Sequence, residues 1–331
     1  MSTASRFLSV LLLQIVGAAH SGQAAEPLDE PVKLVRTLQT LQDQIAHGTL
    51  ESQSARRTLV EAIGARLLAA DRETWRDPRN VDAAILFVLS GGNPAVLKQL
   101  PDARDDGARA QLVAAVRAYA IGSQEEARKL WTPIDLGTLS ISLVGPSALA
   151  KAMLLMDDEP EQAMQFVDLA RLESPGTLIE EAAVRRGIEI AAKLGDRERF
   201  EFFAIRYASR FPRSMYGEAF RHRFSEFYLA IASEEDNQVA PKLETILAPL
   251  ADGDRREIFL EIARLAVIDG KVGLGKSAAE NAATLSGQGT VEMRRAQLYR
   301  AAALSVGLGL VAWVMLAIAR TLGGTTVAAA G

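Results

Sequence analysis

Cysteine is absent from the 331 residues, and histidine occurs only at His20, His47 and His222. Without thiols the chain cannot form a zinc finger, an iron–sulfur centre, a thiol nucleophile or a disulfide framework. His20 lies in a segment that we expect to be removed, so a histidine-rich metal site is also implausible. We therefore expect no metal and no cofactor. The lack of cysteine permits export without requiring it.

Aromatic residues make up only 6% of the chain, and alternating runs rich in Val, Ile and Thr are scarce. Ala, Leu, Arg and Glu dominate instead, which favours helices over sheets. Hydrophobic residues reach 49%, enough for a sizeable core. The 37 basic and 41 acidic residues nearly balance, so charge gives no reason to expect nucleic acid as a partner. The composition predicts an all-α protein.

The N-terminus has the layout of a secretory signal peptide. Arg6 precedes an apolar run from Phe7 to Ala19, and small residues ending at Ala25 precede the acidic Glu26. This order of charge, short apolar run and small residues is typical of a cleaved signal. We expect residues 1–25 to be the signal peptide and the mature protein to lie in the periplasm. An uncleaved membrane anchor is the alternative.

An apolar run also occupies residues 301–320 near the C-terminus. About 19 uncharged residues at 1.5 Å each approach the ~30 Å thickness of the bilayer core. The run therefore predicts a transmembrane helix that tethers the protein to the inner membrane, followed by a disordered tail at 321–331. Arg294, Arg295 and Arg300 precede the run, which opposes the positive-inside bias after a cleaved signal. The alternative is a terminal helix buried against the domain or a partner.

Between the two ends, residues 27–290 form a succession of helix-period segments. Leu34, Leu38, Leu41 and Ile45 recur at helical spacing and stop at Gly48. Helix starts are predicted at Asp77-Pro78 and Asn93-Pro94, where a capping side chain precedes proline, and at Ser123-x-x-Glu126 and Asp158-x-x-Glu161, which have the capping-box spacing.

The helices also repeat. Ala163, Val167, Ala170 and Pro175 have the same spacing as Phe200, Ala204, Tyr207 and Pro212, at an offset of 37 residues. Two helices per unit with a proline after the second are typical of tetratricopeptide arrays. We expect stacked antiparallel helical hairpins, a TPR-like α-solenoid suited to binding proteins or peptides.

One motif satisfies the pattern of a nucleotide-binding P-loop, at residues 270–277 (GKVGLGKS). A P-loop needs a preceding buried strand. The preceding Ile258, Ile262 and Leu265 instead have helical spacing. We interpret the motif as a turn between paired helices, with Gly270 ending the first.

A basic and aromatic segment covers residues 197–224. Phe200, Phe203, Tyr207 and Phe211 lie at helical spacing, which predicts core positions, and the arginines then line an exposed face. Such a face is either simply solvated or contacts an acidic protein or anionic envelope component. Nucleic acid is the least favoured partner.

Acidic pairs such as Glu180-Glu181 and Glu234-Glu235-Asp236 are typical of helix surfaces. Without histidine, cysteine or a metal to organise a site, they do not predict an enzyme. A peptidoglycan-cleaving hydrolase that uses two carboxylates stays as the alternative.

Two blocks of sequence resemble the MotC family of rhizobial motility proteins. The first runs from Asp77 to Ala84 and continues from Ser90 to Ala95; the second runs from Val167 to Thr177, followed by Glu180 to Arg186. Weaker agreement at 35–39, 206–211 and 270–271 extends the resemblance over residues 33–285. Members typically continue into a longer soluble C-terminal region.

The resemblance implies a non-enzymatic periplasmic protein needed for flagellar rotation, which binds the periplasmic part of the stator protein MotB and takes no cofactor or small-molecule substrate. A general periplasmic assembly scaffold is the alternative. The family supplies no binding residues, so the partner contacts are predicted from the chain itself. They are the loop Ser90, Gly91, Gly92, Asn93 and Pro94, and the arginines Arg206, Arg210, Arg213, Arg221 and Arg223.

Overall fold

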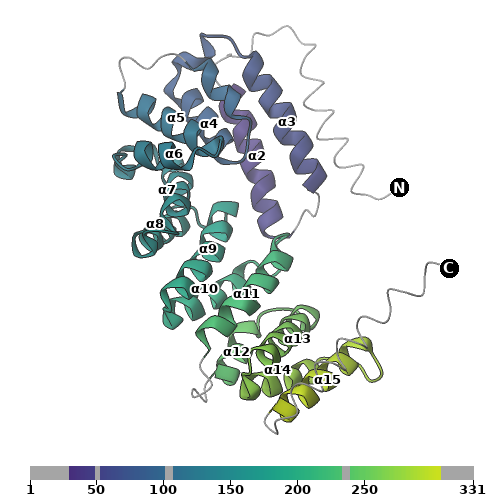
Figure 1. Cartoon of the computed structure of the whole chain (residues 1–331). Helices are drawn as coiled ribbons and strands as arrows, with labels where there is room; N and C mark the ends of the chain where they lie inside the picture. Colours follow the sequence, from purple (N-terminus) through teal and green to yellow (C-terminus); the bar gives the residue numbers. More distant parts are fainter. Residues whose placement is uncertain (1–29, 49–52, 101–106, 233–238, 307–331) are drawn as a thin grey trace, which may run out of the picture.

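The computed structural model describes residues 30–48, 53–100, 107–232 and 239–306. Over these ranges the chain forms fourteen α-helices and three short 3-10 helices, and the described residues contain no strand. Successive helices stack into an elongated array, with the first helices at one end and the last at the other (Figure 1). The predicted all-α class with stacked helical hairpins is confirmed.

The first part of the array is built around helix α4. Its α-helices are α2 (Glu30–Ala46), α3 (Gln53–Ala69), α4 (Pro78–Leu89), α5 (Gly107–Ala120) and α6 (Gln124–Trp131), and its 3-10 helices are η3 (Thr74–Arg76), η4 (Pro94–Gln99) and η5 (Leu136–Thr138). Helices α2 and α5 both pack on α4. The rings of Trp75, Phe87 and Trp131 are among its most completely buried side chains.

The second part is the repetitive one. It comprises α7 (Ile141–Leu155), α8 (Pro160–Glu173), α9 (Leu178–Leu194), α10 (Arg197–Arg210), α11 (Gly217–Ile231), α12 (Val239–Leu247), α13 (Asp252–Ile268), α14 (Val272–Thr284) and α15 (Val291–Val306). Helices α7, α9, α11, α13 and α15 pack on one another in order, and α10, α12 and α14 form a second layer. This two-layer order is that of a solenoid.

The repeat seen in the sequence corresponds to helices α8 and α10. Both have 14 residues, and their first residues, Pro160 and Arg197, lie 37 positions apart. Ala163 and Phe200 hold the matching buried position in each helix. The offset of 37 residues is therefore confirmed as a structural unit.

Two of the four predicted helix caps form as expected. The Asp77 carboxylate accepts a hydrogen bond from the Arg79 backbone N–H, and the Asn93 amide oxygen accepts one from the Ala95 N–H, although the helix after Asn93 is 3-10. The Ser123 hydroxyl donates to the Glu126 carboxylate instead of capping a backbone amide.

The prediction of a cap at Asp158 is wrong. Helix α8 begins after Glu159, because Pro160 has the fixed φ that suits the first helical position. The Asp158 carboxylate pairs with Arg128 at 2.5 Å instead.

The P-loop-like motif is a turn between α13 and α14, as predicted. Gly270 has φ +77°, and the Lys271 N–H donates to the Ala266 carbonyl to close the end of α13. A left-handed glycine is the usual terminator of a helix. The Lys276 side chain is exposed on α14.

The terminal predictions fall mostly outside the described residues. Those at 1–25, 307–320 and 321–331 lie wholly outside them. Residues 301–306 are the end of α15, which starts at Val291 and buries Ala296, Ala302 and Ala303. Among the described residues, none of the helices has the length and apolar character needed to span a membrane.

Candidate functional site

The predicted loop Ser90–Pro94 lies at the C-terminal end of α4 and is held by neighbouring elements. The Ser90 carbonyl accepts hydrogen bonds from Gln42 Nε2 and from the Arg56 guanidinium, both at 3.1 Å. Gly92 is buried beside the Phe87 ring. Of the remaining loop residues, Gly91 and Asn93 are exposed and Pro94 is half-buried. The loop is a fixed corner that borders α2.

The C-terminal end of α2 is tied to the repeat part of the array. The Asp43 carboxylate accepts a hydrogen bond of 3.1 Å from the Leu178 N–H at the start of α9. Burial raises the pKa of Asp43, and the Leu178 N–H partly offsets this. His47 Nε2 lies 2.9 Å from the Gly176 carbonyl, and its ring stacks on Phe211 at 5.7 Å between centroids. These contacts fix α2 across the boundary between the two parts.

The backbone also passes close to the loop between α10 and α11 at Gly48, directly after α2. A Cβ atom added at Gly48 would lie 2.1 Å from the Arg213 carbonyl oxygen. Gly48 also has φ +70°, so only glycine fits here without a shift of the loop between α10 and α11.

A cavity of about 350 Å³ lies where α2, the end of α4, α7 and the start of α9 meet. We call it the α2 cavity. It is lined by Arg36, Gln39, Thr40, Gln42, Asp43, Ser90, Ser142, Pro146, Ser174, Thr177, Leu178 and Ile179. Nine of these twelve residues are polar or charged. The cavity therefore suits a ligand that forms hydrogen bonds along its length.

The walls of the α2 cavity are preformed, but part of its hydrogen-bonding capacity is free. The Gln42 side chain donates to the Ser90 carbonyl, and the Asp43 carboxylate accepts from the Leu178 N–H. Arg36 and Gln39 have no side-chain hydrogen bond or ion pair with another residue of the described part. Of the predicted contact residues, only Ser90 lines this cavity. The contributions of α2 were missed because its sequence gives no sign of which helices it faces.

Arg206 and Arg210, two predicted contacts, bind a buried carboxylate within the chain. Glu180 on α9 has 0% side-chain exposure and lies 2.7 Å from Arg206 and 2.8 Å from Arg210. Its Oε2 atom also accepts a hydrogen bond of 2.6 Å from the Gly176 N–H. Burial opposes the charged form, but these donors together outweigh it and hold the pKa of Glu180 below its usual value.

The neighbouring Glu181 is equally buried, at 0% exposure. Its carboxylate accepts hydrogen bonds from the Tyr207 hydroxyl at 3.0 Å and the Ser214 hydroxyl at 3.3 Å, and pairs with Arg185 at 3.3 Å. Burial and the nearby Glu181 charge raise the pKa of Tyr207, so its hydroxyl stays a donor. The expectation that this acidic pair lies on a helix surface is wrong, because both side chains face α10 and the loop after it.

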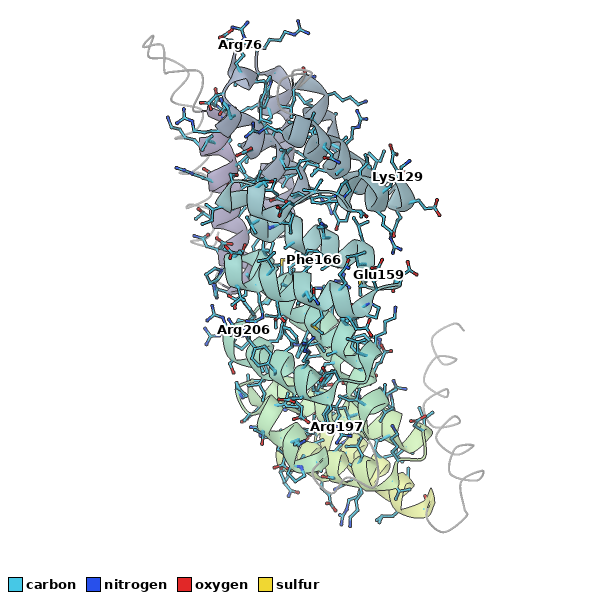
Figure 2. All side chains as sticks on the ribbon, turned by 90° about the vertical axis from the view of Figure 1, so that its left-hand side faces the viewer. Arg76, Lys129, Glu159, Phe166, Arg197 and Arg206 are labelled. Carbon is cyan, nitrogen blue, oxygen red and sulfur yellow. The ribbon has the colours of Figure 1, made fainter. Side chains whose placement is uncertain are left out.

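The other predicted arginines are separate from this network. Arg221 pairs with Asp254 at 2.7 Å, Arg223 pairs with Glu189 at 3.2 Å, and Arg213 is exposed. Charged side chains are spread along the whole array in Figure 2. The arginines therefore do not form one exposed face, because most of them join neighbouring helices. Their role as partner contacts stays a prediction.

The aromatic residues of the same segment form the core that was predicted. The rings of Tyr207 and Phe220 stack at 4.0 Å between centroids, and Phe220 continues to Phe224 at 5.4 Å. Phe202 differs, since it is 46% exposed.

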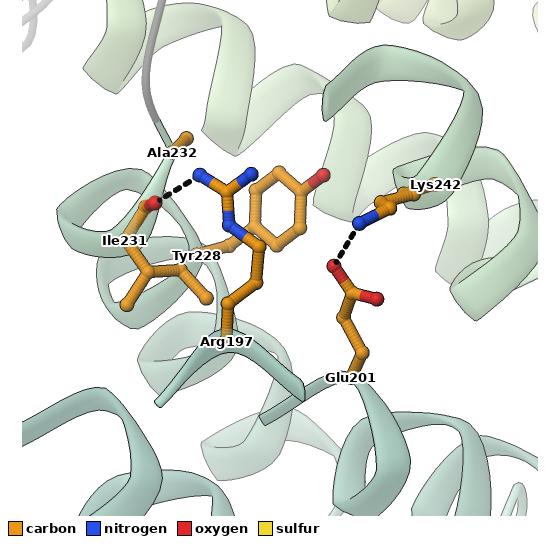
Figure 3. A pocket seen from close by; sticks show the side chains of 6 residues that line it. All are labelled: Arg197, Glu201, Tyr228, Ile231, Ala232 and Lys242. Carbon is orange, nitrogen blue, oxygen red and sulfur yellow. Dashed lines mark hydrogen bonds and ion pairs between the residues drawn. The ribbon is translucent and has the colours of Figure 1, made fainter. Parts of the chain in front are cut away.

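Two other spaces between helices offer less than the α2 cavity. One of about 150 Å³ contains Lys151, which donates to the Ile134 carbonyl at 2.9 Å and whose pKa is lowered by burial. The other, of about 10 Å³, is shown in Figure 3. There Arg197 donates to the Ile231 carbonyl at 2.8 Å, and Glu201 pairs with Lys242 at 3.1 Å. These two contacts hold the helices together, and a space of this size has no room for a ligand.

The described residues contain no cluster of three or more His, Asp or Glu side chains that could hold a metal ion. Neither Glu180 nor Glu181 lines one of the three spaces described above, and both are bound to basic or hydroxyl groups. The residues Glu234, Glu235 and Asp236 lie outside the described part.

Comparison with known proteins gives one consistent relationship. The family described as Chemotaxis protein MotC matches residues 1–308. A protein of that name from Rhizobium meliloti (strain 1021) is 36% identical over 266 residues, which cover 78% of this chain. The same alignment covers 59% of the relative, so the chain spans less than two thirds of the relative's length. No solved structure matches.

Proposed function

Because the chain belongs to the MotC family, we propose that it is a periplasmic motility protein needed for flagellar rotation. In this proposal it binds the periplasmic part of the stator protein MotB and so supports torque generation. It acts by holding a partner and performs no chemistry. The match to a chemotaxis family over residues 1–308 is the observation that carries the proposal.

The structure supports a binding role. A solenoid offers an extended surface for a protein partner. The α2 cavity adds a polar site whose walls are fixed by hydrogen bonds between α2, α4 and α9 before any partner arrives. Preorganised walls lower the entropic cost of binding. The charged and apolar order of residues 6–26 supports export to the periplasm.

The test combines binding with motility. The full-length chain, tagged and expressed in its own bacterium, is used to capture the periplasmic part of MotB from the same organism, and a deletion strain is scored for swimming. We expect capture of MotB and intact but paralysed flagella. The control is a deletion strain that carries the gene on a plasmid, which should swim again.

Two results would contradict the proposal. If the flagella of the deletion strain rotate normally, the chain is not part of the motor system. If the flagella are paralysed but MotB is not captured, the motility role stands and MotB is the wrong partner. Normal swimming together with a general envelope defect would favour a periplasmic assembly scaffold.

A further inference from the structure

The α2 cavity has the chemistry of a peptide-binding site. Small-molecule sites are lined mainly by apolar and aromatic side chains and have volumes of about 300–1,000 Å³. This cavity is near the lower end of that range, yet only Pro146, Leu178 and Ile179 are apolar and no aromatic residue lines it. Its ligand must therefore be rich in hydrogen-bonding groups.

The free groups of the cavity match a polypeptide main chain. Each residue of a peptide presents one N–H donor and one carbonyl acceptor. The half-buried Gln39 amide and the Ser174 hydroxyl can both donate and accept, and the Ser142 hydroxyl, which lies 3.3 Å from the Ser140 hydroxyl, keeps capacity for a further hydrogen bond. An extended segment that passes between α2 and α7 would find such groups on both sides.

Arg36 adds a preference for charge. Its guanidinium is exposed at the cavity and pairs with no carboxylate of the described part. The Asp43 carboxylate is already used on the Leu178 N–H. Arginine binds carboxylates through two parallel hydrogen bonds, so an acidic side chain is its natural partner.

We infer that the α2 cavity holds an extended segment of a partner protein, with its main chain along Gln39, Ser142 and Ser174 and an acidic side chain on Arg36. This inference rests on the proposed function, since it assigns the surface through which the protein binds its partner. It assigns a surface separate from Arg206 and Arg210, whose guanidinium groups are bound to Glu180.

The test uses a bulky side chain at the cavity. Thr40 is exposed, and its hydroxyl donates only to the Arg36 carbonyl one turn earlier. Thr40→Trp would fill the cavity without removing a tertiary hydrogen bond. Thr245 on α12 is a matched control, since it is also exposed and donates to the Pro241 carbonyl one turn earlier.

Affinities of the full-length chain are measured for the intact periplasmic part of MotB and for overlapping synthetic peptides from it. We expect the intact domain and at least one peptide to bind the wild type. Thr40→Trp should weaken both by at least about tenfold, which corresponds to about 1.4 kcal/mol, and Thr245→Trp should change neither.

Arg36→Glu provides a second, independent variant at the same cavity. Replacing the cation with a carboxylate should weaken binding, and the loss should be smaller at high salt, because salt screens the repulsion between the new carboxylate and an acidic partner side chain. Arg57→Glu, at an exposed position on α3 away from the cavity, is the control. Circular dichroism should show the same helical content in all four variants, and a misfolded Thr40→Trp would leave Arg36→Glu to decide.

The outcomes separate the two proposals. If the intact domain binds but both cavity variants bind it as the wild type does, the cavity is not the site and the proposed function stands. If the intact domain does not bind the wild type, MotB is the wrong partner and the inference fails with it, whereas the motility role is decided by the swimming of the deletion strain. A third outcome is that soluble peptidoglycan fragments bind the wild type, that no MotB peptide binds it, and that Thr40→Trp blocks binding of the fragments. The cavity would then bind a glycan, and the peptide inference would be overturned.

Discussion

The interfaces α9–α10 and α13–α14 occupy equivalent places in the array but are built differently. In the first, the buried Glu180 and Glu181 are bound by arginine, tyrosine and serine side chains. In the second, small residues close the gap: Ala263, Ala266, Ala278, Ala279 and Ala282 are all buried. Alanine contacts are tolerant of small shifts, whereas a buried carboxylate accepts only the arrangement that satisfies it.

The charged α9–α10 interface lies next to the α2 cavity. Glu180 accepts a hydrogen bond from the Gly176 N–H, and the next residue, Thr177, lines the α2 cavity. His47, the residue after the end of α2, lies 2.9 Å from the Gly176 carbonyl through its Nε2 atom. The network therefore fixes one wall of the cavity, whereas no residue of α13 or α14 lines it.

The largest expected effect comes from removing one buried carboxylate. Glu181→Ala leaves the Tyr207 hydroxyl without its buried acceptor and Arg185 without its counter-charge, so we expect the free energy of unfolding to fall by about 3 kcal/mol. Urea unfolding measures the loss. Glu280→Ala in α14 is the matched control, since Glu280 pairs with Arg300 at 44% exposure and its loss should cost less than about 1 kcal/mol. Equal losses of stability in Glu181→Ala and Glu280→Ala would contradict the claim that the buried carboxylate stabilises the α9–α10 interface.

The same substitution at two mid-helix glycines should have opposite effects. A Cβ atom at Gly187 in α9 would lie 2.7 Å from the Phe203 ring, and we expect Gly187→Ala to destabilise by about 2 kcal/mol. At Gly275 in α14 the nearest atom, of Val267, is 3.4 Å away. Gly275→Ala should stabilise by about 0.5 kcal/mol through helix propensity. Thermal unfolding of the two variants tests this, and stabilisation by both would show that α9 and α10 are not closely packed.

A smaller effect depends on pH. The folded-state pKa of Glu180 is lowered, so its contribution to stability is present above the usual value of 4.5 and is lost as the pH falls through the folded-state pKa. At neutral pH we expect the free energy of unfolding of the wild type to exceed that of Glu180→Gln by about 1 kcal/mol, because in the variant Arg206 and Arg210 lose their counter-charge. The gap should shrink below pH 4.5 in urea titrations.

Asp43→Asn is the control with the opposite sign. The folded-state pKa of Asp43 is raised above 3.8, so its contribution is present below that pH and is lost as the pH rises through the folded-state pKa. The stability of the wild type relative to Asp43→Asn should therefore decrease with rising pH. If the stability differences from Glu180→Gln and from Asp43→Asn changed with pH in the same direction, the opposite pKa shifts of Glu180 and Asp43 would be contradicted.

Local features were predictable from the sequence. Helical spacing, the caps at Asp77 and Asn93 and the 37-residue offset between Ala163 and Phe200 depend on residues close together in the chain or on a constant period. The candidate site was not predictable in the same way. The pairing of Asp43 with Leu178 joins residues 135 positions apart, and no period in the sequence encodes it.

The arginine segment shows why composition alone misled. Helical spacing correctly assigned Phe200, Phe203 and Tyr207 to the core. The same spacing places Arg206 and Arg210 at the edge of the core stripe and does not show what they contact. Their partner Glu180 comes from α9, so their role depends on how two helices pack.

Hydrogen exchange of the full-length chain, with and without the periplasmic part of MotB, would locate the surface through which the chain binds its partner. We expect added protection of the amides in the second half of α2, at Ser90–Asn93 and in residues 174–179 other than proline, with no change in α13 and α14. Protection confined to α13 and α14, or no protection anywhere, would contradict this expectation.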